Sequence, residues 1–199
     1  IKLVAEQIRN FDQIFTTNYD LFLYYLILES KKFGDFFYMP FFDDERFKRF
    51  QTGDIYKKNH IYYLHGALFL FDKSVETIKI KRDENWLIEV ITKEISKDNY
   101  PLFISEGTSE TKLKGIQSNN YLTYCFRELK ENKKKNLVVF GQSLSDQDLH
   151  IAKAIDENYD KVAISIRISE NKTMNELKSE MNRIKSILKD TEVEFYDST

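Results

Sequence analysis

The stretch of sequence that decides the fold is Ile14-Phe15-Thr16-Thr17-Asn18-Tyr19-Asp20. It begins as a short apolar run of β type, becomes polar at Thr17, and leads into helical periodicity over residues 20–31. A strand that delivers the chain to the N-terminus of a helix is the first part of a β-α-β unit. This stretch therefore predicts a strand and a buried helix near the start of the chain.

Further along the chain, short apolar runs alternate with helical patterns in the same way. We expect strands at 101–105, 137–140, 162–166 and 193–195, and helices at 86–95, 118–129, 146–156 and 173–188. This alternation predicts an α/β fold, with a Rossmann-like, mostly parallel sheet and helices on both faces. Two further β-type runs suggest a β-hairpin insertion near residues 61–81 in a single domain that spans residues 1–199.

The composition limits the classes of partner. With 199 residues, 30 basic and 32 acidic, the formal net charge is −2, which offers no general attraction to nucleic acid. The one basic cluster, Lys130 with Lys133 to Lys135, is interpreted as a solvated turn. The single cysteine, Cys125, excludes an intrachain disulfide, and no apolar run is long enough to cross a membrane. We expect a cytoplasmic protein that binds neither nucleic acid nor membrane.

The polar residues Thr16 to Asp20 follow a strand and precede a helix. Free backbone N–H groups and the helix dipole favour anions at such a place. Asn18 and Asp20 are therefore candidates for contact with a ligand. The alternative is that Thr17 or Asn18 only caps the helix and that Asp20 is an acidic residue of its first turn.

His65 is the most reactive candidate in the chain. It belongs to a set of three histidines with His60 and His150, whose spacing matches no recognised metal site, so no metal is predicted. An imidazole titrates near neutral pH and can accept a proton from a ribose hydroxyl or from water. Gly66 follows directly and allows close backbone approach. The alternative is a histidine whose hydrogen bonds are satisfied in the core.

A second strand end carries Gly141-Gln142-Ser143 and leads into Asp146-Gln147-Asp148. Backbone N–H groups in such a turn can hold a phosphate or a ribose, which makes Gly141, Ser143 and Asp146 candidate binding residues. The alternative is that Ser145 and Asp148 form a capping box for the next helix.

Three of these segments together resemble the sirtuin family, whose enzymes break the nicotinamide–ribose bond of NAD. Sirtuins carry Thr-Gln-Asn-Ile-Asp where this chain has Thr16-Thr17-Asn18-Tyr19-Asp20, and their catalytic histidine lies in a His-Gly pair similar to His65-Gly66. The form Gly-x-Ser-Leu-Ser-Asp-x-Asp-Leu, which fits residues 141–149, is typical of bacterial sirtuin-like families of unknown function. Glu106-Gly107-Thr108-Ser109 also resembles that subgroup, with no known role.

The resemblance implies NAD as the substrate. It places His65 and Asn18 in catalysis, and Thr16, Thr17, Asp20, Gly66, Gly141, Ser143 and Asp146 in binding of the nucleotide. The Gly-rich phosphate turn of a nucleotide-binding fold is absent from residues 1–199, so we expect that first βα unit upstream of Ile1. The zinc-binding cysteines of protein deacetylases are absent too.

The resemblance therefore favours NAD hydrolysis over lysine deacetylation. Bacterial relatives of this kind are often antiphage-defence effectors, which implies an activating protein partner or a homo-oligomer. Two alternatives stay open: a non-catalytic module that senses NAD or ADP-ribose, and a structural domain with a degenerate pocket.

Overall fold

The computed structural model describes residues 2–30, 33–38, 47–52, 59–73, 76–81, 86–131, 135–169 and 172–198. Within it the chain forms two compact units. The first unit comprises Ile1–Ser105 and Gly115–Cys125, and the second unit comprises Glu106–Lys114 and Phe126–Thr199. The prediction of one domain over residues 1–199 stays a prediction.

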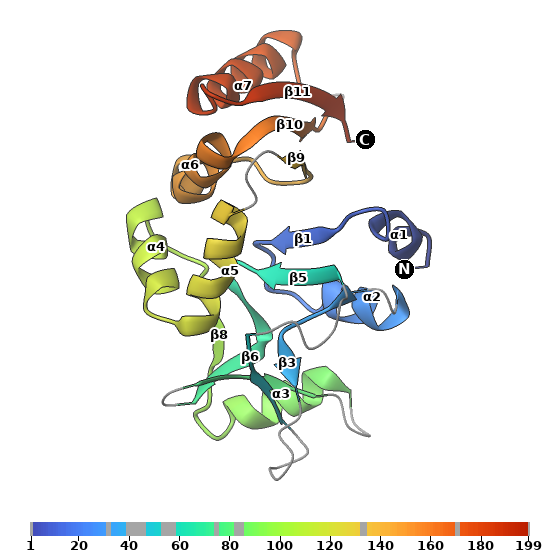
Figure 1. The fold of residues 1–199 in the computed structure, drawn as a ribbon, viewed down its shortest axis with the longest axis vertical. Helices are drawn as coiled ribbons and strands as arrows, with labels where there is room; N and C mark the ends of the chain where they lie inside the picture. The colour runs from blue at the N-terminus through green and yellow to red at the C-terminus, as the bar shows by residue number, and fades with distance from the viewer. Residues whose placement is uncertain are drawn as a thin grey trace. The chain divides into compact units, whose positions relative to one another are not determined.

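The first unit contains a three-stranded parallel sheet. Its strands are β1 (Gln13–Thr16), β5 (Asn59–Tyr63) and β2 (Phe33–Gly34), in the order β1-β5-β2. Figure 1 shows β1 and β5 running in the same direction. Two helices precede and follow β1, α1 (Lys2–Ile8) and α2 (Phe22–Ser30). The strand and helix predicted around Thr16 are confirmed.

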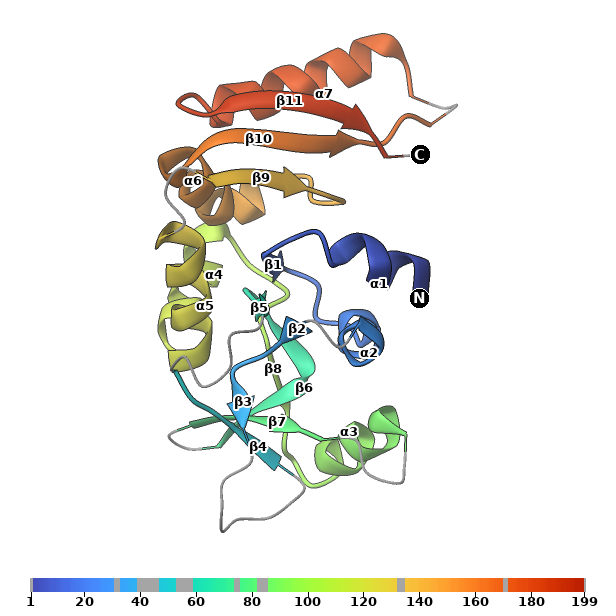
Figure 2. The same ribbon diagram turned by 45° about the vertical axis from the view of Figure 1, so that its right-hand side comes forward.

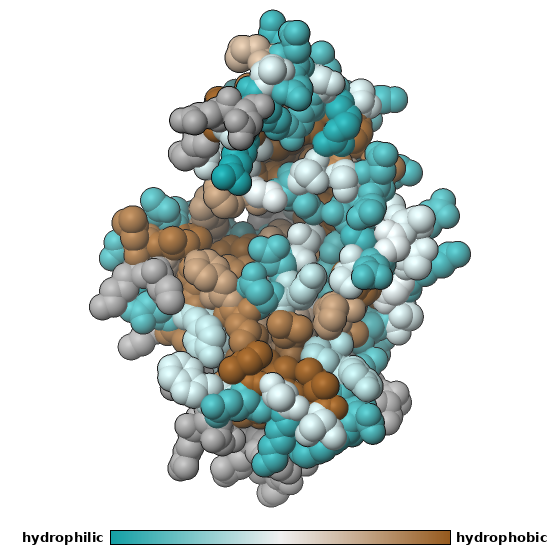
Figure 3. Space-filling model, turned by 180° about the vertical axis from the view of Figure 1, so that it is seen from behind, coloured by the Kyte–Doolittle hydropathy of each residue, from teal (hydrophilic) through white to brown (hydrophobic). Residues whose placement is uncertain are grey.

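Helix α2 is less buried than its sequence predicts. Tyr24 and Leu26 lie in the core, but half of Phe22 and half of Leu28 are exposed. The helix packs against both α1 and β2, and its exposed residues lie away from these contacts. Apolar side chains of the first unit thus remain at its surface, where Figure 3 shows brown areas.

The first unit also contains a five-stranded antiparallel sheet, which the sequence did not predict in full. Its order is β3-β4-β7-β6-β8, formed by β3 (Phe37–Tyr38), β4 (Phe47–Phe50), β7 (Glu76–Ile80), β6 (Gly66–Lys73) and β8 (Pro101–Phe103). Strands β6 and β7 pair antiparallel, as the predicted hairpin requires. Helix α3 (Leu87–Ile95) packs on β6 and β7.

Aromatic rings fill the space between the elements of the first unit. Tyr121 on α5 (Asn120–Glu131) packs against Phe37 and Phe50 with ring centroids 4.9 and 5.1 Å away. Cys125 is buried here. Asn119 caps α5 by accepting the Leu122 N–H at 3.0 Å, so this helix begins two residues later than the expected start at 118.

The second unit is built on a three-stranded parallel sheet. Its strands β9 (Lys135–Val139), β10 (Tyr159–Ile166) and β11 (Glu192–Asp197) follow one another in the order β11-β10-β9. Figure 2 shows their arrows side by side and pointing the same way. The connections are η1 (Asp146–Asp148) with α6 (Leu149–Asn158), and α7 (Met174–Ile187). A fourth helical segment, α4 (Ser109–Gln117), has most of its residues in this unit.

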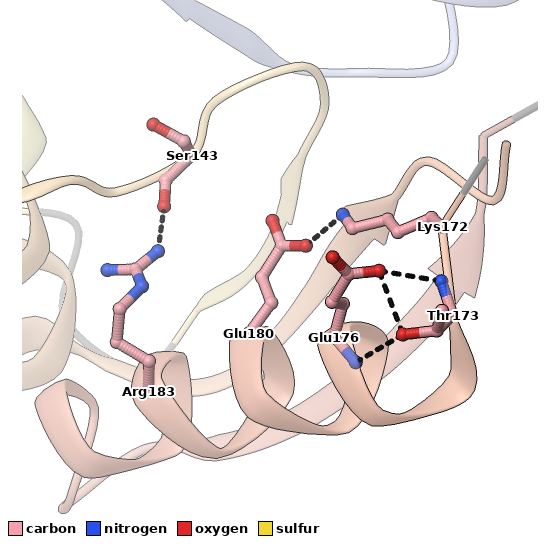
Figure 4. Close-up of polar contacts among 6 residues, drawn as sticks. All are labelled: Ser143, Lys172, Thr173, Glu176, Glu180 and Arg183. Carbon is pink, nitrogen blue, oxygen red and sulfur yellow. Dashed lines mark hydrogen bonds and ion pairs between the residues drawn. The ribbon is translucent and has the colours of Figure 1, made fainter.

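Helix α7 begins as its sequence predicts. The Thr173 hydroxyl accepts the Glu176 N–H at 3.3 Å, and the Glu176 carboxylate accepts the Thr173 N–H at 2.8 Å. This reciprocal pair is the capping box visible in Figure 4, where Lys172 also pairs with Glu180. The two hydrogen bonds of the capping box satisfy backbone N–H groups that would otherwise be left unpaired at the start of the helix.

The two crossovers of this sheet advance in the same direction, from β9 to β10 to β11. Right-handed crossovers then place α6 and α7 on one face, where Val162, Ile164 and Ile166 are buried. On the other face 47% of Val138 is exposed, and 74% of Phe140 just beyond the strand. These two residues of the strand expected at 137–140 therefore lie outside the core.

The α/β class is thus confirmed, with two parallel sheets and one antiparallel sheet. The Rossmann-like details of the prediction stay a prediction. Among the residues that the structure describes, no helix has the length and apolar character needed to cross a membrane.

Candidate functional site

Two of the predicted segments lie next to each other in the first unit. Strands β1 and β5 pair in parallel with Thr16 opposite Tyr63, so both strands end at the same edge of the sheet. Just beyond, the Leu64 N–H donates to the Thr16 carbonyl at 2.8 Å. The carboxyl ends of parallel strands are where α/β sheets bind ligands. We call Thr16–Asp20 with His65 and Gly66 the strand-end site.

Local hydrogen bonds shape the first segment of the strand-end site. The buried Thr16 hydroxyl accepts the Asn18 N–H at 3.0 Å, which turns the chain directly after β1. Thr17 is half-buried, and Asn18 and Asp20 are exposed. Asp20 accepts the Phe22 N–H at 2.8 Å, so its carboxylate caps α2. Asn18 and Tyr19 are therefore exposed residues of this segment whose side chains are not used to cap the helix.

His65 lies at a turn, between β5 and β6, and not inside a strand. Only 3% of the residue is exposed. Its carbonyl accepts the Ile104 N–H at 2.8 Å, which fixes the turn against the chain that follows β8. The apolar run from Ile61 to Phe71 is thus divided at His65 between two sheets.

Gly66 is held by packing of the backbone. Its φ is +79°, and a Cβ at this position would lie 2.1 Å from the Leu102 carbonyl oxygen. Only glycine allows β6 to approach β8 this closely. The structure explains Gly66 by this contact, and its predicted part in cofactor binding stays a prediction.

A pair of aromatic rings flanks the strand-end site. Tyr19 stacks on Phe103 with centroids 5.0 Å apart and planes 23° apart. The Tyr19 carbonyl accepts the Leu68 N–H at 2.9 Å, and Phe103 pairs with Gly66 across β8 and β6. Exposed fractions of 41% for Tyr19 and 36% for Phe103 leave both rings accessible.

The third predicted segment belongs to the second unit and follows β9. Gly141 has φ +69°, and its N–H donates to the Ser165 hydroxyl at 3.0 Å. A Cβ at Gly141 would have no neighbour within 4 Å among the described residues, so the turn has open space beside this glycine. Ser143 and Asp146 are exposed. Their predicted contacts with a nucleotide stay predictions.

Arg183 of α7 holds this turn through its carbonyl groups. The guanidinium donates to the Ser143 carbonyl at 2.6 Å and to the Leu144 carbonyl at 2.9 Å. Figure 4 shows Arg183 reaching from α7 toward Ser143. Leu144 is fully buried with φ +47°, a left-handed conformation that costs energy in any residue with a Cβ. The turn is therefore held in a strained shape by its surroundings.

The predicted capping box of Ser145 and Asp148 does not form, because Asp148 has other partners. Its carboxylate pairs with the Lys112 ammonium at 2.9 Å and accepts from the Gln142 amide at 3.2 Å. The Lys112 and Asp148 side chains are only 6% and 13% exposed. This buried ion pair connects α4 with the start of α6.

Ser109 and His150 form a second connection between the same elements. The Ser109 hydroxyl accepts the His150 N–H at 2.8 Å and lies 3.0 Å from Nδ1 of the ring. Burial lowers the pKa of His150, and Lys112 adds to this effect, while Asp148 opposes it. Burial thus favours the neutral ring, whose tautomer decides whether Nδ1 or the Ser109 hydroxyl donates in their hydrogen bond. We call Ser109, Lys112, Asp148 and His150 the α4–α6 cluster.

The sequence contained a weak signal for the α4–α6 cluster. Ser109 and Lys112 lie three residues apart, as do neighbours on one face of a helix, and Glu106 to Ser109 resembles a pattern of the bacterial subgroup. No local pattern, however, could pair them with Asp148 and His150, which lie 36 and 41 residues further along.

Comparison with known families gives one result. The profile of a family described as Domain of unknown function (DUF4917) matches residues 2–199, so the chain belongs to this family. No curated protein matches the chain.

Proposed function

We propose that this protein hydrolyses NAD at the nicotinamide–ribose bond. The observation that carries the proposal is the hydrogen bond from Leu64 to Thr16, because it joins the two segments that resemble sirtuin catalytic elements at one edge of the first unit. The exposed Asn18 side chain supports contact with a ligand there. Gly141, Ser143 and Asp146, which follow β9 in the second unit, are the other residues proposed to contact a nucleotide.

In the proposed reaction the bond between ribose C1′ and the nicotinamide nitrogen breaks, and nicotinamide leaves with the bonding electrons. Charge develops on the ribose as in other glycosidic cleavages, so the transition state resembles an oxocarbenium ion. A water oxygen then bonds to C1′ and gives up a proton. Asn18 would hold the ribose or this water, and His65 would accept the proton.

The proposal includes a setting for the reaction. By its resemblance to bacterial sirtuin-like domains, the protein would act in the cytoplasm as an antiphage-defence effector. An activating protein partner or self-association would then switch on the hydrolysis, and neither nucleic acid nor a membrane would take part.

A second candidate function is a sensor that binds NAD or ADP-ribose without turnover. Burial of His65 favours this candidate, because a general base must come within hydrogen-bonding distance of the proton that it accepts. The two candidates differ in whether nicotinamide is released.

Chromatographic measurement of nicotinamide release from NAD tests the proposal. We expect His65→Ala to lower the rate by about 10²- to 10⁴-fold, the usual contribution of a general base. The matched control is His60→Gln, which removes an imidazole from β5 in the same unit. NAD binding in a thermal-shift assay without nicotinamide release would favour the sensor. Absence of both binding and release would overturn both candidates.

A further inference from the structure

Two lysines face each other on one side of the antiparallel sheet of the first unit. The register of β4 and β7 places Lys48 directly opposite Lys79. Phe50 is on the same face of β4 and packs on Tyr121 at 5.1 Å, so this face points toward the aromatic core. Arg49 is on the other face and pairs with Glu76 at 2.6 Å. Like charges directly opposite each other are unfavourable, and more so where water is scarce.

Lys79 has attractive partners within the first unit. Its ammonium pairs with Asp35, and the two side chains are only 10% and 9% exposed. The same ammonium lies 4.9 Å from the centre of the Tyr24 ring, which attracts a cation. The Phe37 N–H donates to the other Asp35 oxygen at 3.3 Å. Both oxygens of the Asp35 carboxylate are therefore occupied, one by Lys79 and the other by the backbone.

Lys48 is left without a counterion of its own. No ion pair or hydrogen bond joins its amine to another residue that the structure describes. Burial lowers the pKa of Lys48, Lys79 and Lys81 lower it further, and attraction to Asp35 only partly opposes them. When two amines share one carboxylate, the unpaired amine gives up its proton more readily.

We propose that Lys48 is a nucleophilic amine that binds a carbonyl compound, an aldehyde or a ketone, as an imine. A partly buried amine beside a second cation loses its proton more readily, and this arrangement activates lysines for this chemistry. The Lys48 Nζ atom bonds to the carbonyl carbon of the compound. The carbonyl oxygen then departs as water with the two hydrogens of the amine, which leaves the imine. No oxidant is needed. The proposal does not depend on NAD hydrolysis, because Lys48 lies on β4 of the antiparallel sheet and is not part of the strand-end site.

Trace labelling with propionaldehyde and cyanoborohydride near neutral pH, with peptide mapping by mass spectrometry, tests this proposal. We expect Lys48 to react at least about tenfold faster than the exposed Lys178 of α7. The rate of Lys48 should also level off at a lower pH than that of Lys178. Equal rates, or protection of Lys48, would overturn the proposal.

The variant Lys79→Gln tests the cause of the reactivity. It removes the neighbouring cation and releases Asp35 to pair with Lys48, so labelling of Lys48 should fall toward the rate of Lys178. Arg49→Gln is the matched control, since it removes a cation from the opposite face of β4 and should leave the rate unchanged. If Lys48 reacts as fast in Lys79→Gln as in the unaltered protein, the explanation is wrong. If Lys79→Gln does not fold, the pH profile of the unaltered protein decides.

Discussion

Replacement of Gly66 by alanine tests the packing that holds the His65 turn. A residue with a Cβ at φ +79° costs about 1–2 kcal/mol by itself. The added Cβ would also lie 2.1 Å from the Leu102 carbonyl oxygen, closer than real Cβ atoms come to other atoms. Forcing extra volume into packed structure costs about 1–3 kcal/mol more. We therefore expect Gly66→Ala to lower the free energy of unfolding by about 2–5 kcal/mol.

Gly141→Ala is the matched control for this substitution. Its φ of +69° carries the same backbone cost, but nothing lies within 4 Å of the added Cβ. Alanine restricts the unfolded chain equally in both variants, so this contribution cancels in the comparison. The free energy of unfolding of Gly141→Ala should therefore fall only by the cost of the backbone conformation, about 1–2 kcal/mol.

Urea unfolding followed by far-ultraviolet circular dichroism measures both losses. If the two units unfold in separate transitions, each variant is compared with the unaltered protein within the transition of its own unit. A Gly66→Ala protein that loses no more stability than Gly141→Ala would refute the reasoning, because the contact with Leu102 would then contribute nothing.

Two further predictions concern the α4–α6 cluster. Lys112→Met leaves the Asp148 carboxylate buried without its cation and should lower the free energy of unfolding by about 3–5 kcal/mol, whereas Lys114→Met, on the same helix but outside the ion pair, should have little effect in the same urea assay. The lowered pKa of His150 means that the unfolded chain binds a proton more readily than the folded chain. This contribution to stability is complete above the unfolded pKa of about 6.5 and is lost as the pH falls below it. Urea midpoints at about pH 7.5 and about pH 5.5 should therefore differ more in the unaltered protein than in His150→Gln; an equal difference would contradict the assignment.

Much of the fold could be predicted from local patterns. Helix α7 follows from its apolar stripe and capping box, and strands β1 and β10 follow from short β-type runs between helical patterns. These features depend on residues close together in sequence, where propensity and capping act directly.

The features that could not be predicted depend on distant residues. The run from Ile61 to Phe71 looks like one strand, yet it is divided at His65 because its halves pair with different sheets. Helix α4 has a polar sequence without an apolar stripe. Burial of its Lys112 could not be predicted, because it depends on the ion pair with the distant Asp148. Burial of Val138 and Phe140 could not be judged either, because it depends on which face of the sheet the helices cover.

The candidate site was predictable to a similar extent. The strand-end positions of Thr16 and His65 follow from the ends of apolar runs, and the structure brings these two segments together through Leu64. The stacked pair of Tyr19 and Phe103 could not be found, because the two residues lie in segments far apart in the sequence.

The division of the chain between the units has a consequence for dissecting the protein. The chain passes from the first unit to the second after Ser105, returns after Lys114, and leaves again after Cys125. The boundary between the units falls within α4 and again within α5, so each of these helices contributes residues to both units. No single cut of the gene can therefore yield two complete halves. A fragment ending at Ser105 would lack Tyr121, whose ring packs between Phe37 and Phe50. Expression trials should accordingly keep both units on one polypeptide, and functions should be assigned by point substitution and not by truncation.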